Sequence, residues 1–270
     1  YLGVIFLANL LCRRKIMLAN GFGPIFSKNI APKILEKSLK MVLNTFDFIS
    51  VRDKNSQKTL KKLLPERKIE LVPDPASIGF VKINQRLIKS VSCDGLAENT
   101  PYFAFCFNSK VFKGAKISPI GVAKSLEFIS KSLKLRPKIV VLNENEDLQF
   151  ALDIQRRFSS AKVFVPQGLC DAALCFRCAK FVISGRYHGV LLAFALGTPI
   201  LALSGDPKIQ SACEDFSNPA PFPFHKVADG DSLLKHIQII IEKSEKIAPK
   251  TCELMKISGK KAEKMLDYLI

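Results

Sequence analysis

The sequence lacks the features of a membrane-spanning or secreted protein. No apolar run reaches the roughly 20 residues that a helix needs to cross a bilayer. The apolar opening, residues 1–12, is followed by Arg13, Arg14 and Lys15, whereas a signal peptide carries its positive charges in front of the apolar segment. Internal repeats and low-complexity segments are absent as well. We therefore predict a folded, cytoplasmic protein.

The usual motifs of metal and nucleotide chemistry are also missing. There is no HExxH sequence, no second Cys-x2-Cys pair and no Walker loop, so neither a protein-bound metal nor a P-loop is predicted. Eight cysteines lie at irregular spacings, mostly in apolar segments, which is typical of reduced thiols rather than of a disulfide framework. The spacing of Cys170, Cys175 and Cys178 can hold an iron–sulfur cluster, but these residues lie in a predicted amphipathic helix, which favours core packing.

Acidic residues are few in comparison with basic ones. Lys and Arg number 41 against 24 Asp and Glu, which gives a net charge of +17. A basic surface attracts phosphorylated ligands, nucleic acid or anionic lipid, and the charge alone does not choose among them. The lysines are scattered over predicted helices, and no basic tract alternates with stacking aromatics, so the pattern is not typical of single-strand binding.

Predicted strands and helices alternate along the chain, which favours an α/β fold with parallel sheets. In the first part of the chain, apolar runs predict strands at residues 15–20, 47–51 and 69–72. Helices are expected at residues 1–11, from Pro32 to about Thr45, and after Asp53, which is a natural N-cap. Further strands are expected at residues 102–107, 138–142, 162–165, 181–183 and 200–203.

The pattern predicts two Rossmann-like domains. The first comprises residues 1–81, a polar linker follows at residues 82–101, and the second comprises residues 102–250. Two helices close the chain, at about residues 231–243 and 252–269, and residues 251–270 form the C-terminal helix. The chain begins with Tyr1 and in helix-like sequence, so we expect the start of the first domain to be missing.

Chemistry is expected around one stretch, residues 181–209. A buried strand is followed by Arg186 and His188, then by a helix at residues 189–196 and by another strand. Parallel α/β sheets bind ligands outside the carboxyl ends of their strands, which is where these two side chains would lie. Arginine suits carboxylate or phosphate, and histidine titrates near neutral pH. Taken singly, a salt-bridged surface arginine and a structural histidine are the alternatives.

A second candidate is the turn Gly21-Phe22-Gly23-Pro24. Two glycines around one residue allow the backbone to turn sharply and to approach a ligand closely, so Gly21 and Gly23 are candidate substrate-binding residues. A simple turn between a strand and a loop is the alternative.

Five segments match, in order, the signatures of a known family. Residues 1–25 are similar to its helix, strand and G-x-G-P turn, DFISVRDKNSQKTL to its D-x-I-x-V-R-D-x-x-S segment, and VPDPA to its D-P-A turn. FVISGRYHGVLLAFALGTPILALS is similar to its strand, R-x-H and helix signature, which GDPKI closes. Together these segments resemble the polysaccharide pyruvyl transferase family across nearly the whole chain.

The resemblance implies a GT-B-like fold, in which two Rossmann-like domains face each other across a cleft. It implies an enzyme that moves the pyruvyl group of phosphoenolpyruvate onto a sugar of a cell-surface polysaccharide or its precursor, forming a pyruvate ketal. Matched by motif, the R-x-H pair is Arg186 and His188, and the arginine of V-R-D is Arg52. These residues would bind the donor and supply the acid. Phosphoenolpyruvate is the donor substrate, and no cofactor or metal is implied.

The chain also departs from the family's pattern. It lacks the glycine-rich loop upstream of the first helix, and residues 105–108 lack an arginine that is often found there. Tyr187, Gly189 and Gly205 stand where Leu, Ala and an aromatic residue are common, and Asn20 replaces the usual Gln. The acceptor sugar therefore stays open.

Two other functions stay open as well. The first is a GT-B glycosyltransferase that uses a nucleotide diphospho-sugar. The second is a non-catalytic module on anionic membrane or nucleic acid, which only the net charge supports. For the pyruvyl transferase we expect a sugar or lipid-linked glycan as acceptor, a peripheral contact with the anionic inner membrane face, and no nucleic acid partner.

Overall fold

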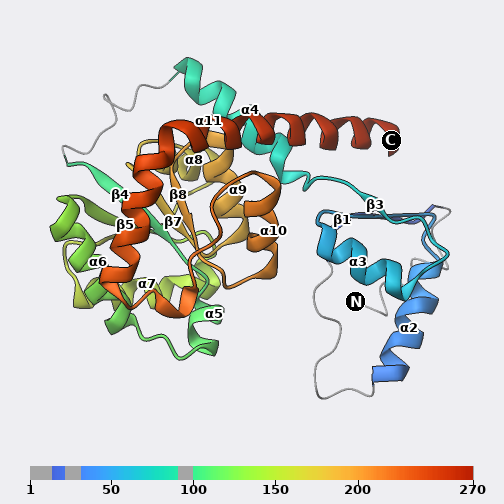
Figure 1. Ribbon diagram of the computed structural model, residues 1–270, viewed down its shortest axis with the longest axis horizontal. Helices are drawn as coiled ribbons and strands as arrows, with labels where there is room; N and C mark the ends of the chain where they lie inside the picture. Colours follow the sequence, from blue (N-terminus) through green and yellow to red (C-terminus); the bar gives the residue numbers. More distant parts are fainter. Residues whose placement is uncertain (1–13, 22–31, 91–99, 270) are drawn as a thin grey trace. The chain divides into compact units, whose positions relative to one another are not determined.

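The computed structural model describes residues 14–21, 32–90 and 100–269 (Figure 1). The chain divides into two compact units. The first comprises Tyr1–Pro75 and Lys260–Ile270, and the second comprises Ala76–Gly259. Each unit contains a parallel sheet with helices between its strands, so the predicted α/β class is confirmed. The helix expected at residues 1–11 lies outside the described residues.

The first unit has a three-stranded sheet in the order β1-β2-β3, with parallel pairing throughout. Its described elements are β1 (Ile16–Asn20), α2 (Pro32–Asn44), β2 (Phe48–Val51), α3 (Lys54–Leu63) and β3 (Glu70–Leu71). Asp53 caps α3 as predicted: its Oδ1 accepts from the Ser56 N–H at 2.7 Å, and its Oδ2 accepts from the Ser56 hydroxyl at 2.6 Å. The V-R-D-x-x-S segment thus encodes the end of a strand and the start of a helix.

The second unit is a five-stranded parallel sheet in the order β6-β5-β4-β7-β8. Its strands are β4 (Tyr102–Cys106), β5 (Arg136–Val140), β6 (Lys162–Phe164), β7 (Val182–Ser184) and β8 (Ile200–Ala202). Its helices are α4 (Ala76–Ser90), α5 (Ser109–Gly114), α6 (Pro119–Leu133), α7 (Glu144–Arg157), α8 (Leu169–Arg177), α9 (Tyr187–Leu196), α10 (Pro207–Asp215), the short 3-10 helix η2 (Phe224–Lys226) and α11 (Gly230–Leu269).

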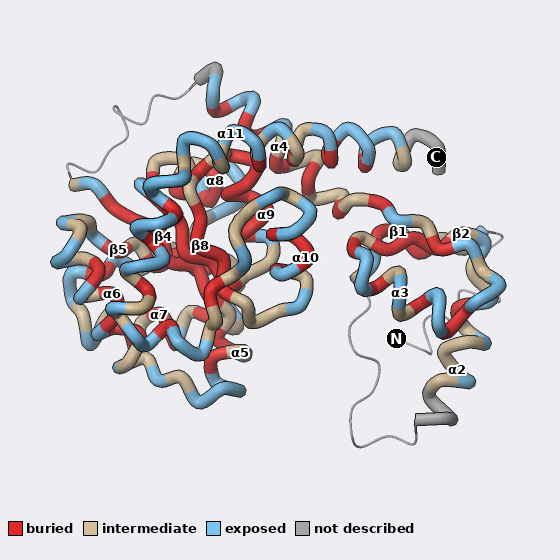
Figure 2. The backbone as a smooth tube through the Cα atoms, in the orientation of Figure 1, coloured by how far each residue is buried: buried red, intermediate tan, exposed pale blue. Residues whose placement is uncertain are grey.

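The core of the second unit lies on both faces of this sheet. Tyr102, Ala104 and Cys106 point to the face that α4, α8 and α9 cover, while Phe103 and Phe105 point to the face that α6, α7 and α11 cover. All five residues of β4 are buried, as expected of a central strand (Figure 2). None of the described helices is both long and apolar enough to span a membrane.

The predicted linker at residues 82–101 is wrong over its first part, because residues up to Ser90 belong to α4. Phe80, Ile83 and Leu87 are buried in the core of the second unit, with the spacing of one helical face. Lysine, asparagine and glutamine residues between them concealed this pattern in the sequence. The unit begins at Ala76, which differs from the predicted boundary, and residues 91–99 lie outside the described part of the chain.

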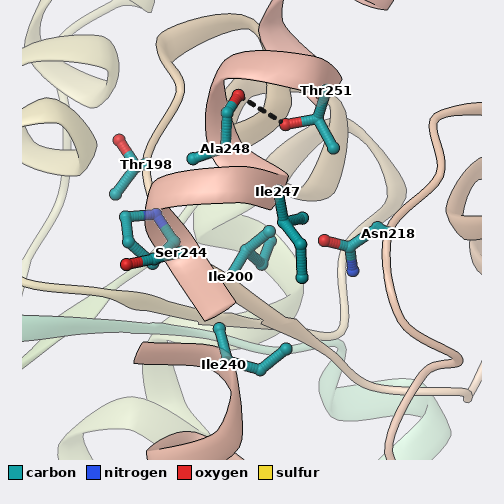
Figure 3. A pocket seen from close by; sticks show the side chains of 9 residues that line it. Thr198, Ile200, Asn218, Ile240, Ser244, Ile247, Ala248 and Thr251 are labelled. Carbon is teal, nitrogen blue, oxygen red and sulfur yellow. Dashed lines mark hydrogen bonds between the residues drawn. The ribbon is translucent and has the colours of Figure 1, made fainter. Parts of the chain in front are cut away.

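The two helices predicted at the end of the chain are one helix, α11, which passes through Pro249. Proline removes a backbone donor and usually breaks a helix. Here burial of Ile237 and Ile240 before the proline, and of Met255 after it, holds both flanking segments in place. Beside the amino end of β8, α11 lines a pocket with an accessible volume of about 10 Å³ (Figure 3), which is room for about one water.

The cysteines agree only partly with the prediction of reduced thiols. Cys106, Cys170, Cys175, Cys213 and Cys252 are free, whereas Cys178 is disulfide-bonded. A bridge depends on proximity in the fold, which irregular spacing in the sequence does not exclude. Among the described residues, no group of three or more His, Cys, Asp and Glu side chains is arranged to hold a metal ion.

The packing of α4 can be tested with two isoleucines of the same helix. Ile83 is 7% exposed and Ile88 is 60% exposed. We expect Ile83→Ala to lower the free energy of unfolding by about 2–4 kcal/mol, because it leaves a cavity in the core. Ile88→Ala should change it by less than about 0.5 kcal/mol. Urea denaturation of both variants measures the difference, and equal effects would contradict the placement of α4.

Candidate active site

The second unit has a topological switch point at the carboxyl ends of β4 and β7. From the central strand β4 the chain moves outward through β5 and β6, then returns to β7 on the other side of β4 and moves outward again to β8. Loops that follow β4 and β7 therefore leave the sheet in opposite directions, and such a point is where open α/β sheets bind ligands. Arg186, the N-cap of α9, lies in the loop after β7, as predicted.

Arg186 is held by two carboxylates from the first turn of α7. Its Nε and Nη2 donate to Asp147 Oδ2 at 2.9 and 2.6 Å, and Nη2 also donates to Glu146 Oε2 at 2.7 Å. Nε also donates to the Phe107 carbonyl at 3.2 Å. Burial alone lowers the pKa of the guanidinium, but Glu146 and Asp147 outweigh it and raise the pKa above its ordinary value. Arg186 therefore stays charged, and Nη1 makes no hydrogen bond to the described residues.

Asp147 connects the three loops that follow β4, β5 and β7. Its side chain is 1% exposed, and its Oδ1 accepts from the backbone N–H of Ser109 at 2.9 Å while Oδ2 accepts from Arg186. The Ser109 hydroxyl in turn donates to the Glu146 carbonyl at 2.7 Å. An acidic group in the first turn of a helix is also favoured by the helix dipole. This network fixes the shape of the carboxyl edge of the sheet.

Glu146 lies at the surface of this network and bridges two cations. Its Oε2 accepts from Arg186, and its Oε1 accepts from Lys110 Nζ at 2.6 Å. The hydrogen bond from Lys110, followed by that from Arg186, lowers the pKa of the Glu146 carboxyl. The four side chains Arg186, Lys110, Glu146 and Asp147 thus sum to no net charge.

The turn into α9 explains one departure from the family's pattern. The Ser184 hydroxyl accepts from the Arg186 N–H at 3.2 Å and donates to the Arg186 carbonyl at 3.0 Å. A Cβ added at Gly189 would lie 2.6 Å from Ser184 Oγ, closer than such atoms come in proteins. Gly189 is therefore required by the serine that shapes this turn. Beneath the turn, burial, with the charge of Asp147, raises the pKa of the Cys106 thiol to about 12, so this thiol stays protonated.

His188 is the second residue of α9 and is exposed, so it is not a core histidine. Its ring lies edge-on to two aromatic rings, with centroids 5.3 Å from Tyr187 and 6.4 Å from Phe80. The structure thus places Arg186 and His188 at the same helix start, next to the switch point. Their roles in binding and catalysis stay predictions.

The other predicted residues belong to the first unit. Arg52 follows β2, and its Nη1 donates to Asp74 Oδ2 at 2.6 Å. This ion pair joins two of the signatures, V-R-D and D-P-A. Gly21 follows β1 and is half-buried, whereas Gly23 lies outside the described residues. Arg186 and His188, in contrast, belong to the second unit.

Sequence reasoning missed Asp147, Glu146 and Lys110 as parts of the site. The signal that could have indicated the carboxylates is the acidic segment of residues 144–147, which comes a few residues after β5 and opens α7. Lys110 carries no comparable signal, because it is one of many scattered lysines.

Solved structures with a similar fold are nucleotide-sugar enzymes and related proteins. A UDP-GlcNAc 2-epimerase from Methanocaldococcus jannaschii, bound to UDP-GlcNAc and UDP, has a TM-score of 0.65 at 13% identity. The match covers 99% of this chain and 72% of the epimerase chain. The Neisseria meningitidis UDP-GlcNAc 2-epimerase bound to UDP-GlcNAc has a TM-score of 0.61 at 15% identity, and the match covers 98% of this chain and 73% of the epimerase chain. Anabaena HepE in complex with UDP-glucose has a TM-score of 0.54 at 15% identity, and the match covers 99% of this chain and 75% of the HepE chain. At these identities the likeness shows the fold alone.

Two units with parallel sheets, and a switch point with polar side chains, define a GT-B-like α/β protein. The chain belongs to the polysaccharide pyruvyl transferase family, whose model matches residues 1–207. No curated protein matches the chain.

The buried ion pair can be tested against an exposed one on the same helix. We expect Asp147→Asn to lower the free energy of unfolding by about 3 kcal/mol, because it leaves the Arg186 charge poorly compensated. The control is Asp153→Asn, which breaks an exposed pair with Arg156 (2.9 Å) and should cost less than about 1 kcal/mol. Chemical denaturation measures both, and similar effects would show that Asp147 does not hold the site together.

The lowered pKa of Glu146 predicts that the contribution of this carboxyl to the free energy of unfolding depends on pH. A carboxyl whose pKa is lower in the folded state stabilises the fold above its unfolded pKa, and this stabilisation is lost as the pH falls. The stability difference between wild type and Glu146→Gln should therefore be constant above the ordinary value of 4.5 and shrink below it. Denaturation of both proteins across a pH series measures this. A difference that is unchanged at low pH would contradict the pairing of Glu146.

Proposed function

We propose that the protein transfers the pyruvyl group of phosphoenolpyruvate to a sugar of a cell-surface polysaccharide or its lipid-linked precursor, forming a pyruvate ketal. Membership of the polysaccharide pyruvyl transferase family supports this proposal. The observation that carries it is the R-x-H pair at the switch point, where Arg186 is anchored and His188 is exposed at the start of α9.

The chemistry requires a proton donor and a group that holds anions. Protonation of the methylene carbon of phosphoenolpyruvate creates an oxocarbenium-like centre, which a sugar hydroxyl attacks. Loss of phosphate and attack by a second hydroxyl then close the ketal. Histidine suits the first step because it titrates near neutral pH, and an exposed His188 can reach a bound donor.

Arg186 would orient the donor and stabilise the departing phosphate. Asp147 fixes the guanidinium, and Nη1 is left to bind an anionic group. Arg52 and the glycines of the G-x-G-P turn are the corresponding candidates in the first unit, for the donor and for the sugar. The net charge of +17 is consistent with a peripheral contact with an anionic membrane face if the acceptor is lipid-linked.

The activity is tested by incubating the full-length protein with phosphoenolpyruvate and candidate glycans while phosphate release is followed. Release that depends on the acceptor, together with a mass increase of the glycan, is the expected result. Absence of release with every acceptor, alongside turnover of a nucleotide sugar, would overturn the proposal.

One specific observation favours a second candidate, a glycosyltransferase that uses a nucleotide diphospho-sugar. Three solved structures with a similar fold hold UDP-GlcNAc or UDP-glucose. Calorimetric titration with UDP and with phosphoenolpyruvate distinguishes the two candidates. Tight binding of UDP and none of phosphoenolpyruvate would favour the glycosyltransferase.

The role of His188 is tested by His188→Ala. We expect the variant to fold normally, because the side chain is exposed, to bind phosphoenolpyruvate, and to lose about 100- to 10,000-fold in turnover, as for one general acid. His225→Ala, which removes another exposed histidine in η2, is the control and should keep normal turnover. Near-normal turnover of His188→Ala would place the acid elsewhere.

A further inference from the structure

The two carboxylates on Arg186 differ in how firmly they are held. Asp147 is 1% exposed, accepts two hydrogen bonds from Arg186 and also binds the Ser109 N–H. Glu146 is 24% exposed, and within the described part of the chain its side chain contacts two cationic groups, Arg186 and Lys110. Its backbone is fixed by the Ser109 hydroxyl, so its side chain can turn away without moving the helix. Removal of the Asp147 carboxylate would leave the Arg186 charge poorly compensated. Removal of the Glu146 carboxylate would leave Arg186 paired with Asp147.

The Glu146 carboxylate is bound in the way that a ligand's anionic group would be. One oxygen faces Arg186 Nη2 at 2.7 Å and the other faces Lys110 Nζ at 2.6 Å. Arg186 follows β7 and Lys110 follows β4, so the two cations come from the two sides of the switch point. Charge-assisted hydrogen bonds of this kind are the usual means of holding carboxylate and phosphate groups.

We infer that Arg186 and Lys110 form an anion-binding site in which the Glu146 carboxylate holds the place of a substrate's carboxylate or phosphate group. The ligand exchanges with Glu146, while Asp147 keeps the guanidinium oriented. Lys110 is 72% exposed, so its pair with Glu146 contributes little to stability. The pair between Glu146 and Arg186 is partly buried, and Asp147 keeps Arg186 paired when Glu146 leaves. The identity of the ligand as phosphoenolpyruvate rests on the proposed function, but the anion site itself does not.

The inference makes Lys110 a binding residue and Glu146 a competitor of the ligand. Substitution of Glu146 should therefore tighten the binding of anions, and substitution of Lys110 should weaken it. A change in net charge alone would act equally on any acidic residue nearby. Glu144 provides the matched control, because it lies in the same turn of α7 and is exposed.

The experiment is calorimetric titration of the full chain with inorganic phosphate at low ionic strength. We expect Glu146→Gln to bind phosphate about three- to tenfold more tightly than wild type, and Glu144→Gln to differ from wild type by less than about twofold. Lys110→Ala should bind phosphate at least about threefold more weakly. Because Lys110 is exposed, this variant decides the question even if Glu146→Gln fails to fold.

The opposite results overturn the inference. Equal tightening in Glu146→Gln and Glu144→Gln would show an effect of net charge alone. Unchanged binding in Lys110→Ala, or no measurable binding to any variant, would also contradict an anion site.

Parallel titrations with phosphoenolpyruvate and UDP separate this inference from the proposed function. Tighter phosphate binding by Glu146→Gln, together with no acceptor-dependent phosphate release by the wild-type protein, would support the anion site and contradict the proposed function. The same gain for UDP but not for phosphoenolpyruvate would support the site and favour the nucleotide-sugar reaction.

Discussion

The ion pair between Asp147 and Arg186 is the constraint on which the carboxyl edge of the second unit depends. A buried charged pair gives little net stability, since both groups lose water, but loss of one partner is costly. Such a pair therefore contributes more to geometry than to stability. Here it specifies how the loops after β4, β5 and β7 meet, and it orients a guanidinium beside an exposed histidine. The half-buried Glu146 and the exposed Lys110 add charge to this frame without determining its shape.

The sequence predicted the parts of the fold that local patterns encode. The strand, R-x-H turn, helix and strand of residues 181–203 are confirmed, because apolar runs and the Gly197 and Pro199 stops are local signals. The amphipathic face of α4 and the continuity of α11 were missed, because burial against distant elements decided both. The pairing of Arg186 with Asp147, 39 residues away, was likewise outside the reach of spacing arguments.

Two of the departures from the family's pattern have a local steric cause. Gly189 accommodates the Ser184 hydroxyl, and a Cβ at Gly205 would lie 2.6 Å from Val111 Cγ1 of α5. Both glycines bring the backbone close to elements that flank the switch point. The residues common at these positions in the family would thus require different neighbours here. Nothing in the structure explains Tyr187 in the same way.

The position of β4 has a consequence for how the protein is made. β4, whose five residues are all buried, is the first strand of the second unit to leave the ribosome. β5 and β6, which are made next, lie on one side of β4 and leave its other edge unpaired. The other edge pairs with β7, which begins at Val182. Until then the nascent chain carries an apolar strand with an open edge, the kind of surface that seeds aggregation. Folding of this unit during synthesis is therefore most prone to aggregation after β6 has formed and before β7 has been made.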